Sequence, residues 1–100
     1  NLRFDKSTAK SNVDHAVLWQ NIPNPFTHET IVNYSLPSTG WVKWSITDVS
    51  GKTVQSWSKE LAKGDHQEII NKSILHLGGV YYYRLEYNGY TDVKKLIMME

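Results

Sequence analysis

The chain has 100 residues, of which 40% are hydrophobic and 21% charged, and its formal net charge is +1. This composition is ordinary for one small globular domain, and the near-neutral charge excludes a field that would attract nucleic acid or an anionic membrane. The absence of cysteine excludes disulfides, thiolate catalysis and cysteine-based zinc sites together.

The N-terminal segment differs in character from the rest. Residues 1–14 are mostly polar and small and show no periodicity, which predicts a linker from an upstream domain. Because the chain begins with Asn1, we expect it to be a fragment of a longer protein. From His15 onward, turn signals recur about every ten residues between short alternating runs, a spacing typical of an all-β sandwich.

The first two predicted strands flank a proline-rich segment. We predict a short strand over residues 17–20 and a longer one over residues 31–36, whose alternate apolar side chains share one face. Pro23 and Pro25 lie between them, and each fixes its own φ and biases the preceding residue away from helix. The segment therefore predicts an extended connection into the second strand.

The middle of the chain contains the clearest alternation of polar and apolar residues. Over residues 41–48, Val42, Trp44 and Ile46 alternate with polar side chains, which predicts a half-buried strand. Two further strands are predicted over residues 53–61 and 66–71, each preceded by a glycine-containing turn. In the former, Val54 and Trp57 fall on opposite faces, which predicts either a β-bulge or an exposed tryptophan.

The last third of the chain predicts a connection followed by a hairpin. Residues 72–79 form an irregular connection with at most one helical turn, because two glycines end it. Strands over residues 80–87 and 90–99 are joined by Asn88-Gly89, a type I′ turn signal. Apolar residues occupy both faces of the final strand, which is therefore either covered on both sides or offers one side to a partner.

Together these signals predict one domain. The fold class is all-β, a small immunoglobulin-like antiparallel β-sandwich of about seven strands over residues 15–100.

The residue pattern predicts neither a catalytic site nor a metal site. None of the histidines has the spacing of a compact metal site, and no serine lies in a Gly-x-Ser-x-Gly turn. The histidines are His15, His28, His66 and His76. We therefore expect no catalytic residues, no metal, no cofactor and no small-molecule substrate. Dispersed basic residues without interleaved aromatics predict no nucleic-acid partner either.

Aromatic residues make up 12% of the chain and divide into two predicted groups. Alternation assigns one group to the core: Tyr34, Trp44, Tyr81 and Tyr83. Trp41 and Trp57 remain as the expected exposed pair. If both lie on one flat face, they form a binding patch of the kind found in carbohydrate-binding modules.

Five sequence blocks occur in a fixed order. They are Pro23-Asn24-Pro25-Phe26 after Ile22, residues 30–37, residues 48–54, the strand with Gly79, Tyr81 and Tyr83, and the tail Lys94-Lys95-Leu96-Ile97-Met98. With this ordered set the chain resembles the C-terminal sorting domain (type A) of the type IX secretion system of Bacteroidetes-type bacteria, over residues 18–100. It departs at Ile22, where that family commonly has tyrosine, and at His76, where a leucine is expected.

The resemblance implies an address label rather than an enzyme. It implies that the domain directs a cargo protein through the periplasm and across the outer membrane, to the cell surface or the medium. The implied partners are the type IX translocon and a surface sortase, with cleavage expected within residues 7–17. Recognition is expected in the final hairpin and tail, residues 90–100, and there in residues 94–98, where an exposed strand edge can be captured by strand addition. Apart from the resemblance, the edge strands of the sandwich leave a dimer open.

Two alternatives remain open. Immunoglobulin-like domains of flagellar hook-capping proteins share the Asn-Pro-Phe and Val-Tyr-Tyr-Tyr patterns, but an insertion common there is missing from residues 70–79. An adhesion or sugar-binding module depends on Trp41 and Trp57 alone. A charged and apolar tail favours sorting, whereas a coplanar exposed aromatic pair favours binding.

Overall fold

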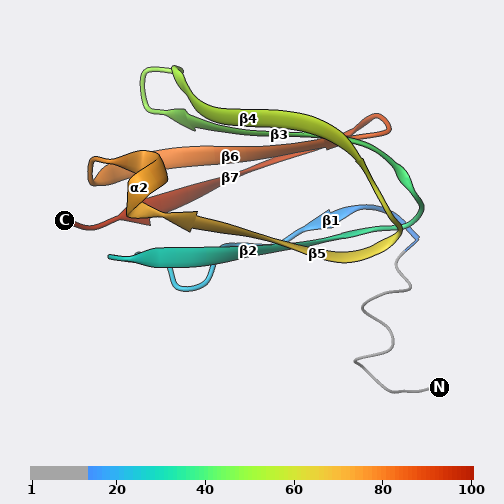
Figure 1. The fold of residues 1–100 in the computed structure, drawn as a ribbon, viewed down its shortest axis with the longest axis horizontal. Helices are drawn as coiled ribbons and strands as arrows, with labels where there is room; N and C mark the ends of the chain where they lie inside the picture. The colour runs from blue at the N-terminus through green and yellow to red at the C-terminus, as the bar shows by residue number, and fades with distance from the viewer. Residues whose placement is uncertain (1–13) are drawn as a thin grey trace.

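The computed structural model describes residues 14–100, which form two antiparallel sheets packed face to face (Figure 1). The three-stranded sheet has the order β1-β2-β5, with β1 (Val17–Leu18), β2 (Glu29–Leu36) and β5 (Gly64–Asn71). The four-stranded sheet has the order β4-β3-β6-β7, with β4 (Thr53–Leu61), β3 (Gly40–Asp48), β6 (Gly79–Tyr87) and β7 (Tyr90–Met98). Seven strands in this part of the chain confirm the predicted all-β sandwich. The predicted linker falls almost entirely on residues 1–13, outside the described residues.

The core lies between the two sheets, where the predicted alternation places its apolar side chains. Tyr34 of the three-stranded sheet and Trp44 of the four-stranded sheet are fully buried, and their ring centroids lie 6.3 Å apart. Tyr83 also stacks on Trp44, with a centroid separation of 5.6 Å. Large rings thus join the layers, as a thin sandwich requires.

The strand boundaries differ from the predicted ones where pairing, rather than side-chain pattern, decides them. β1 ends at Leu18, two residues earlier than predicted. After it, the pairing with β2 is reduced to a bond from Trp19 N to Asn33 O at 3.0 Å and the isolated bridge between Ile22 and Ile31. β5 begins at Gly64 rather than residue 66, because Gly64 pairs with Leu36 at the end of β2.

A β-bulge in β4 resolves the two possibilities left open by Val54 and Trp57. The register shifts between Ile46 and Thr47, so that two residues of β3 face three residues of β4. Beyond the shift, Trp57 pairs with Trp44 and faces the core, with ring centroids 6.4 Å apart. The predicted bulge is confirmed.

A one-turn helix, α2 (Lys72–Leu75), occupies the connection that was predicted to be irregular. The side chain of Asn71 caps it by accepting a bond from Ser73 N at 3.1 Å. The helix ends at His76, which has a φ of 69°, and the bond from Leu77 N to Leu75 O at 2.8 Å closes a tight turn around it. Leu75 is buried in the core, whereas His76 is exposed.

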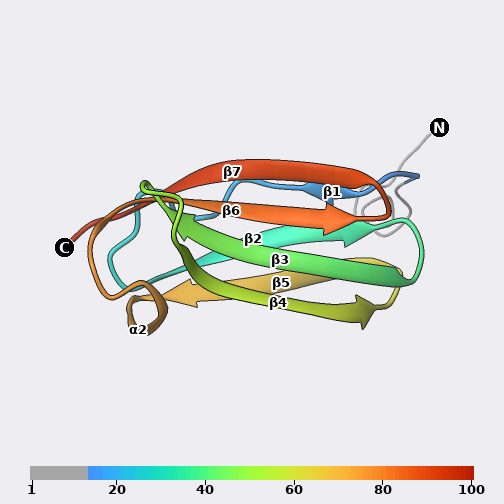
Figure 2. The same cartoon turned by 90° about the horizontal axis from the view of Figure 1, so that it is seen from above.

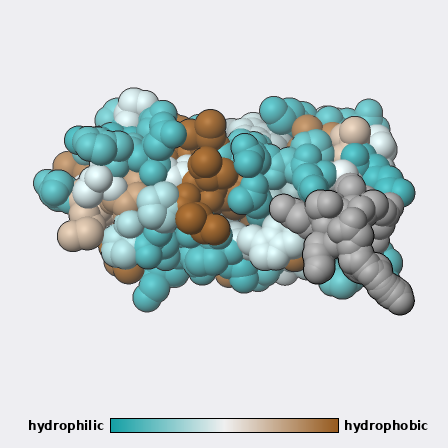
Figure 3. All heavy atoms as spheres, turned by 90° about the horizontal axis from the view of Figure 1, so that it is seen from below, coloured by the Kyte–Doolittle hydropathy of each residue, from teal (hydrophilic) through white to brown (hydrophobic). Residues whose placement is uncertain are grey.

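The outer face of the three-stranded sheet carries an apolar stripe. Ile31 pairs with Ile69 across β2 and β5, and Ile22 forms a bridge with Ile31 on the other side. Ile22 is 67% exposed and Ile69 53% exposed, and the stripe appears as the brown band across the middle of Figure 3. No helix in the described part of the chain has the length and apolar character needed to cross a membrane.

Candidate recognition site at the C-terminal strand

β7 is the edge strand of the four-stranded sheet, and it contains the predicted recognition residues. It pairs with β6 over its whole length, from Tyr90 opposite Tyr87 to Met98 opposite Gly79. Figure 2 shows that β7 and β1 lie on one side of the sandwich, and β4 and β5 on the other. The chain that leaves β1 therefore runs close to the outer edge of β7.

Residues 20–26, which we call the clasp, bind that outer edge. The main chain of Phe26 pairs with β7, accepting a bond from Met99 N at 2.7 Å and donating one to Ile97 O at 3.0 Å. The Asn24 side-chain oxygen accepts a bond from Ile97 N at 2.9 Å. Gln20 Nε2 donates to Lys95 O at 2.7 Å. The proline-rich motif and the C-terminal tail thus form one unit.

Buried polar side chains hold the clasp in shape. Asn21 is 2% exposed, and its Nδ2 donates to Pro23 O at 3.1 Å and to Thr30 Oγ1 at 3.0 Å. Thr30 Oγ1 in turn donates to Pro23 O at 2.8 Å. Phe26 is 2% exposed and anchors the far end of the clasp in the core. The bend between β1 and β2 is therefore fixed by hydrogen bonds at its centre and by burial at its end.

The five predicted recognition residues do not share one environment. Leu96 and Met98 are buried core residues with exposed fractions of 0% and 3%. Lys95 is exposed on the outer face, and Ile97 is half-buried there. Lys94 faces the core side, with its Nζ 3.5 Å from the Asp92 carboxylate. Only Lys95, Ile97 and Lys94 are accessible to a partner in this fold.

The motif residues of β6 tie that strand to segments on either side of it. Gly79 has a φ of 144°, which favours glycine, and it opens β6 opposite Met98. The Tyr81 hydroxyl donates to Leu77 O at 2.6 Å, behind α2. The Tyr83 hydroxyl donates to Trp19 O at 2.9 Å, just ahead of the clasp, and burial raises the pKa of Tyr83 to about 12. The motif tyrosines therefore have structural roles in the sandwich.

Sequence reasoning missed the roles of Gln20 and Asn21 in the clasp and of Thr30, which bonds to the clasp from β2. All three are polar residues close to the two prolines, and this clustering is the only signal in the sequence that points to them. The clasp also bears on the expected capture of β7 by strand addition. The edge of β7 between residues 95 and 99 already makes four hydrogen bonds to the clasp, so an added strand must first displace it.

The prediction that Trp41 and Trp57 form an exposed pair is wrong. Trp41 pairs with Glu60 on the outer face and is 65% exposed, whereas Trp57 pairs with Trp44 on the inner face. Lys59 Nζ lies 4.4 Å from the centroid of the Trp57 ring. The bulge in β4 shifts Trp57 by one residue, and a shift of one residue moves a side chain to the opposite face.

The histidines occupy separate structural positions. The His66 ring stacks on Tyr34 with a centroid separation of 5.4 Å, and the His15 ring lies 2.9 Å from the carboxylate of its neighbour Asp14. Within residues 14–100, no three His, Asp or Glu side chains gather where they could hold one metal ion.

A comparison with protein families matches residues 21–99 to the family described as secretion system C-terminal sorting domain. The comparison with curated proteins finds no match. The matched segment begins inside the clasp, at Asn21, and ends at Met99, the residue whose N–H bonds to Phe26. It spans all of the sandwich except β1. The chain therefore belongs to the secretion system C-terminal sorting domains, which are sorting signals for type IX secretion and imply export across the outer membrane.

Proposed function

We propose that this domain directs the protein that precedes it through the type IX secretion system and has no catalytic activity of its own. The observation that supports the proposal is the convergence of the family motifs on one place. The clasp, the start of β6 and the tail of β7 are far apart in sequence, yet they are joined by the main-chain bonds of Phe26 and the pairing of Gly79 with Met98.

Within this unit, we propose that the translocon recognises the accessible face of β7. Leu96 and Met98 act through the core, because both are buried. Lys95 and the half-buried Ile97 are the tail residues that remain available on the outer face. A lysine beside an apolar residue offers a partner both a charge and a hydrophobic contact.

We further propose that a surface sortase cleaves ahead of the sandwich, within residues 7–17. A protease needs an extended and accessible substrate, and Asp14 and His15 are exposed at the start of the described chain. Mass spectrometry of the exported cargo would locate its new C-terminus, and a cut after residue 17 would contradict this part of the proposal.

A reporter assay tests the sorting function. A neutral fluorescent protein with an export signal is fused ahead of the full chain and expressed in a bacterium with the type IX system. We expect the reporter at the surface or in the medium. Retention in the periplasm would overturn the sorting function itself.

A pair of matched variants tests the recognised face. Lys95→Glu reverses an exposed charge on β7, and Lys63→Glu reverses an exposed charge in the turn before β5. We expect Lys95→Glu to hold the reporter in the periplasm and Lys63→Glu to leave export unchanged. Export of both variants at the level of the unmodified chain would remove Lys95 from the recognised face while leaving the sorting function standing.

A further inference from the structure

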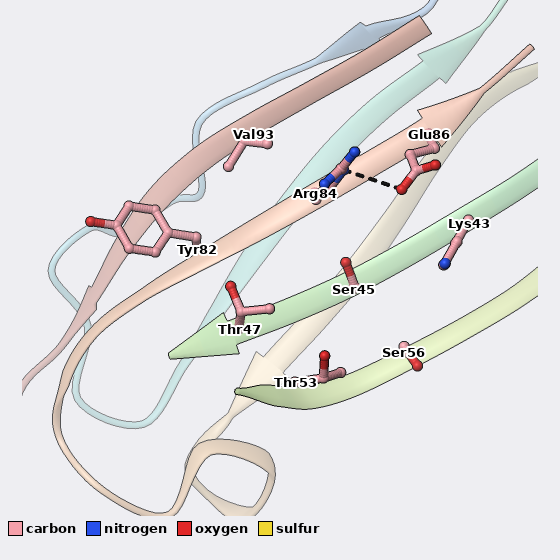
Figure 4. A pocket seen from close by; sticks show the side chains of 9 residues that line it. All are labelled: Lys43, Ser45, Thr47, Thr53, Ser56, Tyr82, Arg84, Glu86 and Val93. Atoms are coloured by element: carbon pink, nitrogen blue, oxygen red, sulfur yellow. Dashed lines mark ion pairs between the residues drawn. The ribbon is translucent and has the colours of Figure 1, made fainter. Parts of the chain in front are cut away.

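The outer face of the four-stranded sheet contains a shallow trough of about 420 Å³ (Figure 4). Its floor consists of short hydroxyl side chains of β3 and β4: Ser45, Thr47, Thr53 and Ser56. Its wall consists of long side chains of β6, among them Tyr82, Arg84 and Glu86. The hollow exists because short side chains on two strands adjoin long side chains on the third.

The trough continues toward the hairpin between β6 and β7. A second hollow of about 340 Å³ shares Lys43 and Glu86 with the first and extends to Trp41 beside the turn at Asn88. Tyr82 therefore lines one end of a continuous surface and Trp41 the other. Tyr82 is 37% exposed and Trp41 65% exposed, and neither is needed to fill the core.

The strand register sets the distance between the two aromatic residues. Thr47 is the sixth residue after Trp41 along β3, and it pairs with Tyr82 on β6. At about 3.3 Å per residue, the two rings are on the order of 20 Å apart along the strand direction. A ligand that contacts both is therefore an elongated chain.

The middle of the trough offers both hydrogen-bond donors and acceptors. Arg84 Nε lies 3.1 Å from the Glu86 carboxylate, and Lys43 is the register partner of Glu86 on β3. A carboxylate flanked by two cations presents acceptors and donors side by side, and the hydroxyl floor adds more of each. The Arg84–Glu86 pair cancels its own charge, which disfavours a polyanion such as nucleic acid.

We propose that this trough binds a linear oligosaccharide. Sugar rings carry apolar C–H faces that stack on Trp41 and Tyr82, and their hydroxyl groups bond to Glu86, Arg84 and the floor. A shallow polar surface suits a hydrated chain better than an apolar small molecule, which favours an enclosed pocket. None of these residues belongs to the clasp or to the tail residues 94–98. Tyr82 is, however, the register partner of Lys95 on the same outer face, so Trp41 is the aromatic residue that separates sugar binding from the proposed sorting function.

Isothermal titration calorimetry of the full chain with cellohexaose, xylohexaose and mannohexaose tests the proposal. We expect at least one hexasaccharide to bind and to change the tryptophan fluorescence. Trp41→Ala and Tyr82→Ala should each weaken that binding by about tenfold or more, as the loss of one stacking contact predicts. Ser45→Arg should abolish it by filling the floor without touching either aromatic residue.

Trp19→Ala is the matched control, because Trp19 is a partly exposed tryptophan ahead of the clasp and outside the trough. It should bind the hexasaccharide as the unmodified chain does, and thermal melts establish that each variant is folded. No binding of any of the three sugars, or binding that survives Trp41→Ala, Tyr82→Ala or Ser45→Arg, would overturn the proposal.

Discussion

Single side chains hold the clasp on β7, and Asn24 is the clearest example. It lies between Pro23 and Pro25, which have no N–H of their own, and its side-chain oxygen reaches Ile97 N at 2.9 Å. The Asn-Pro-Phe motif is visible in the sequence, but its contact is not. Residues 24 and 97 are separated by most of the chain, and no local pattern specifies which edge group an asparagine will reach.

Asn24→Ala should loosen the end of β7. The substitution leaves Ile97 N without its acceptor at a strand edge, and we expect the free energy of unfolding to fall by about 1 kcal/mol. Hydrogen exchange followed by NMR should show faster exchange of the Ile97 amide. Asn33→Ala, which removes an exposed bond with Gln67 on the other sheet, is the control. Unchanged exchange at Ile97 would contradict the role of the clasp.

The two buried tyrosines Tyr34 and Tyr83 predict a loss of stability in alkali. Burial raises the pKa of Tyr83 to about 12, and burial together with the charge of Glu68 raises the pKa of Tyr34. In the unfolded chain tyrosine ionises near its ordinary pKa of about 10. The folded state therefore binds these protons more tightly, so stability is complete below about pH 10 and falls as the pH rises toward 12.

Thermal melts at several pH values between 8 and 11.5 test whether stability falls as the pH rises. We expect a constant midpoint up to about pH 10 and a steep fall above it. Tyr83→Phe lowers the midpoint at neutral pH, because it removes the bond to Trp19 O, but it should also make the alkaline fall shallower. An equally steep fall in both proteins would show that another group causes it.

At the scale of elements, the predictable strands are those whose own side chains alternate. β2 and β3 follow the two-residue period because one face of each is fully buried. Pairing with neighbouring strands sets the ends of β1 and β5 instead. The bulge opposite Ile46 decides on which face of β4 Trp57 lies. These features depend on pairing between strands, which a single sequence does not contain. The candidate recognition site was also predicted only in part. The sequence blocks that form it were identified, but the contacts by which the clasp joins them were not.

The turn after α2 carries backbone strain at His76. Its φ of 69° and ψ of −48° place a residue with a side chain in a conformation that favours glycine. We expect His76→Gly to raise the free energy of unfolding by about 1 kcal/mol, measured by urea denaturation. Asn88→Gly, at a φ of 49° that asparagine tolerates, should gain less. A His76→Gly protein no more stable than the unmodified chain would contradict the strain.

At the scale of the whole molecule, the two sides of the sandwich are closed differently. On one side the clasp leaves β1 of one sheet and bonds to β7 of the other, so it bridges both sheet edges. On the opposite side, β4 and β5 are the edge strands, and α2 contacts both of them (Figure 2). An edge-strand dimer has complete strand edges available at β4 and β5, whereas the edge of β7 is engaged by the clasp over residues 95–99.

Deletion of residues 94–100 should unfold the domain as well as remove the tail. The deletion removes Leu96 and Met98 from the core and leaves the clasp without its partner. Loss of a buried side chain of this size costs about 2–5 kcal/mol, and a domain of this size has only about 5–15 kcal/mol in total. Circular dichroism should show no cooperative melt for this deletion, whereas removal of Glu100 alone, which bonds to Gly78 N, should keep one.

A cooperative melt in the deleted protein would mean that β7 contributes little to the fold. If the cooperative melt is lost, retention of a reporter in the periplasm by this deletion has two explanations, because the fused domain lacks both its folded sandwich and any recognition signal in the tail. Lys95→Glu keeps the core and changes only an exposed charge, so it separates recognition from folding.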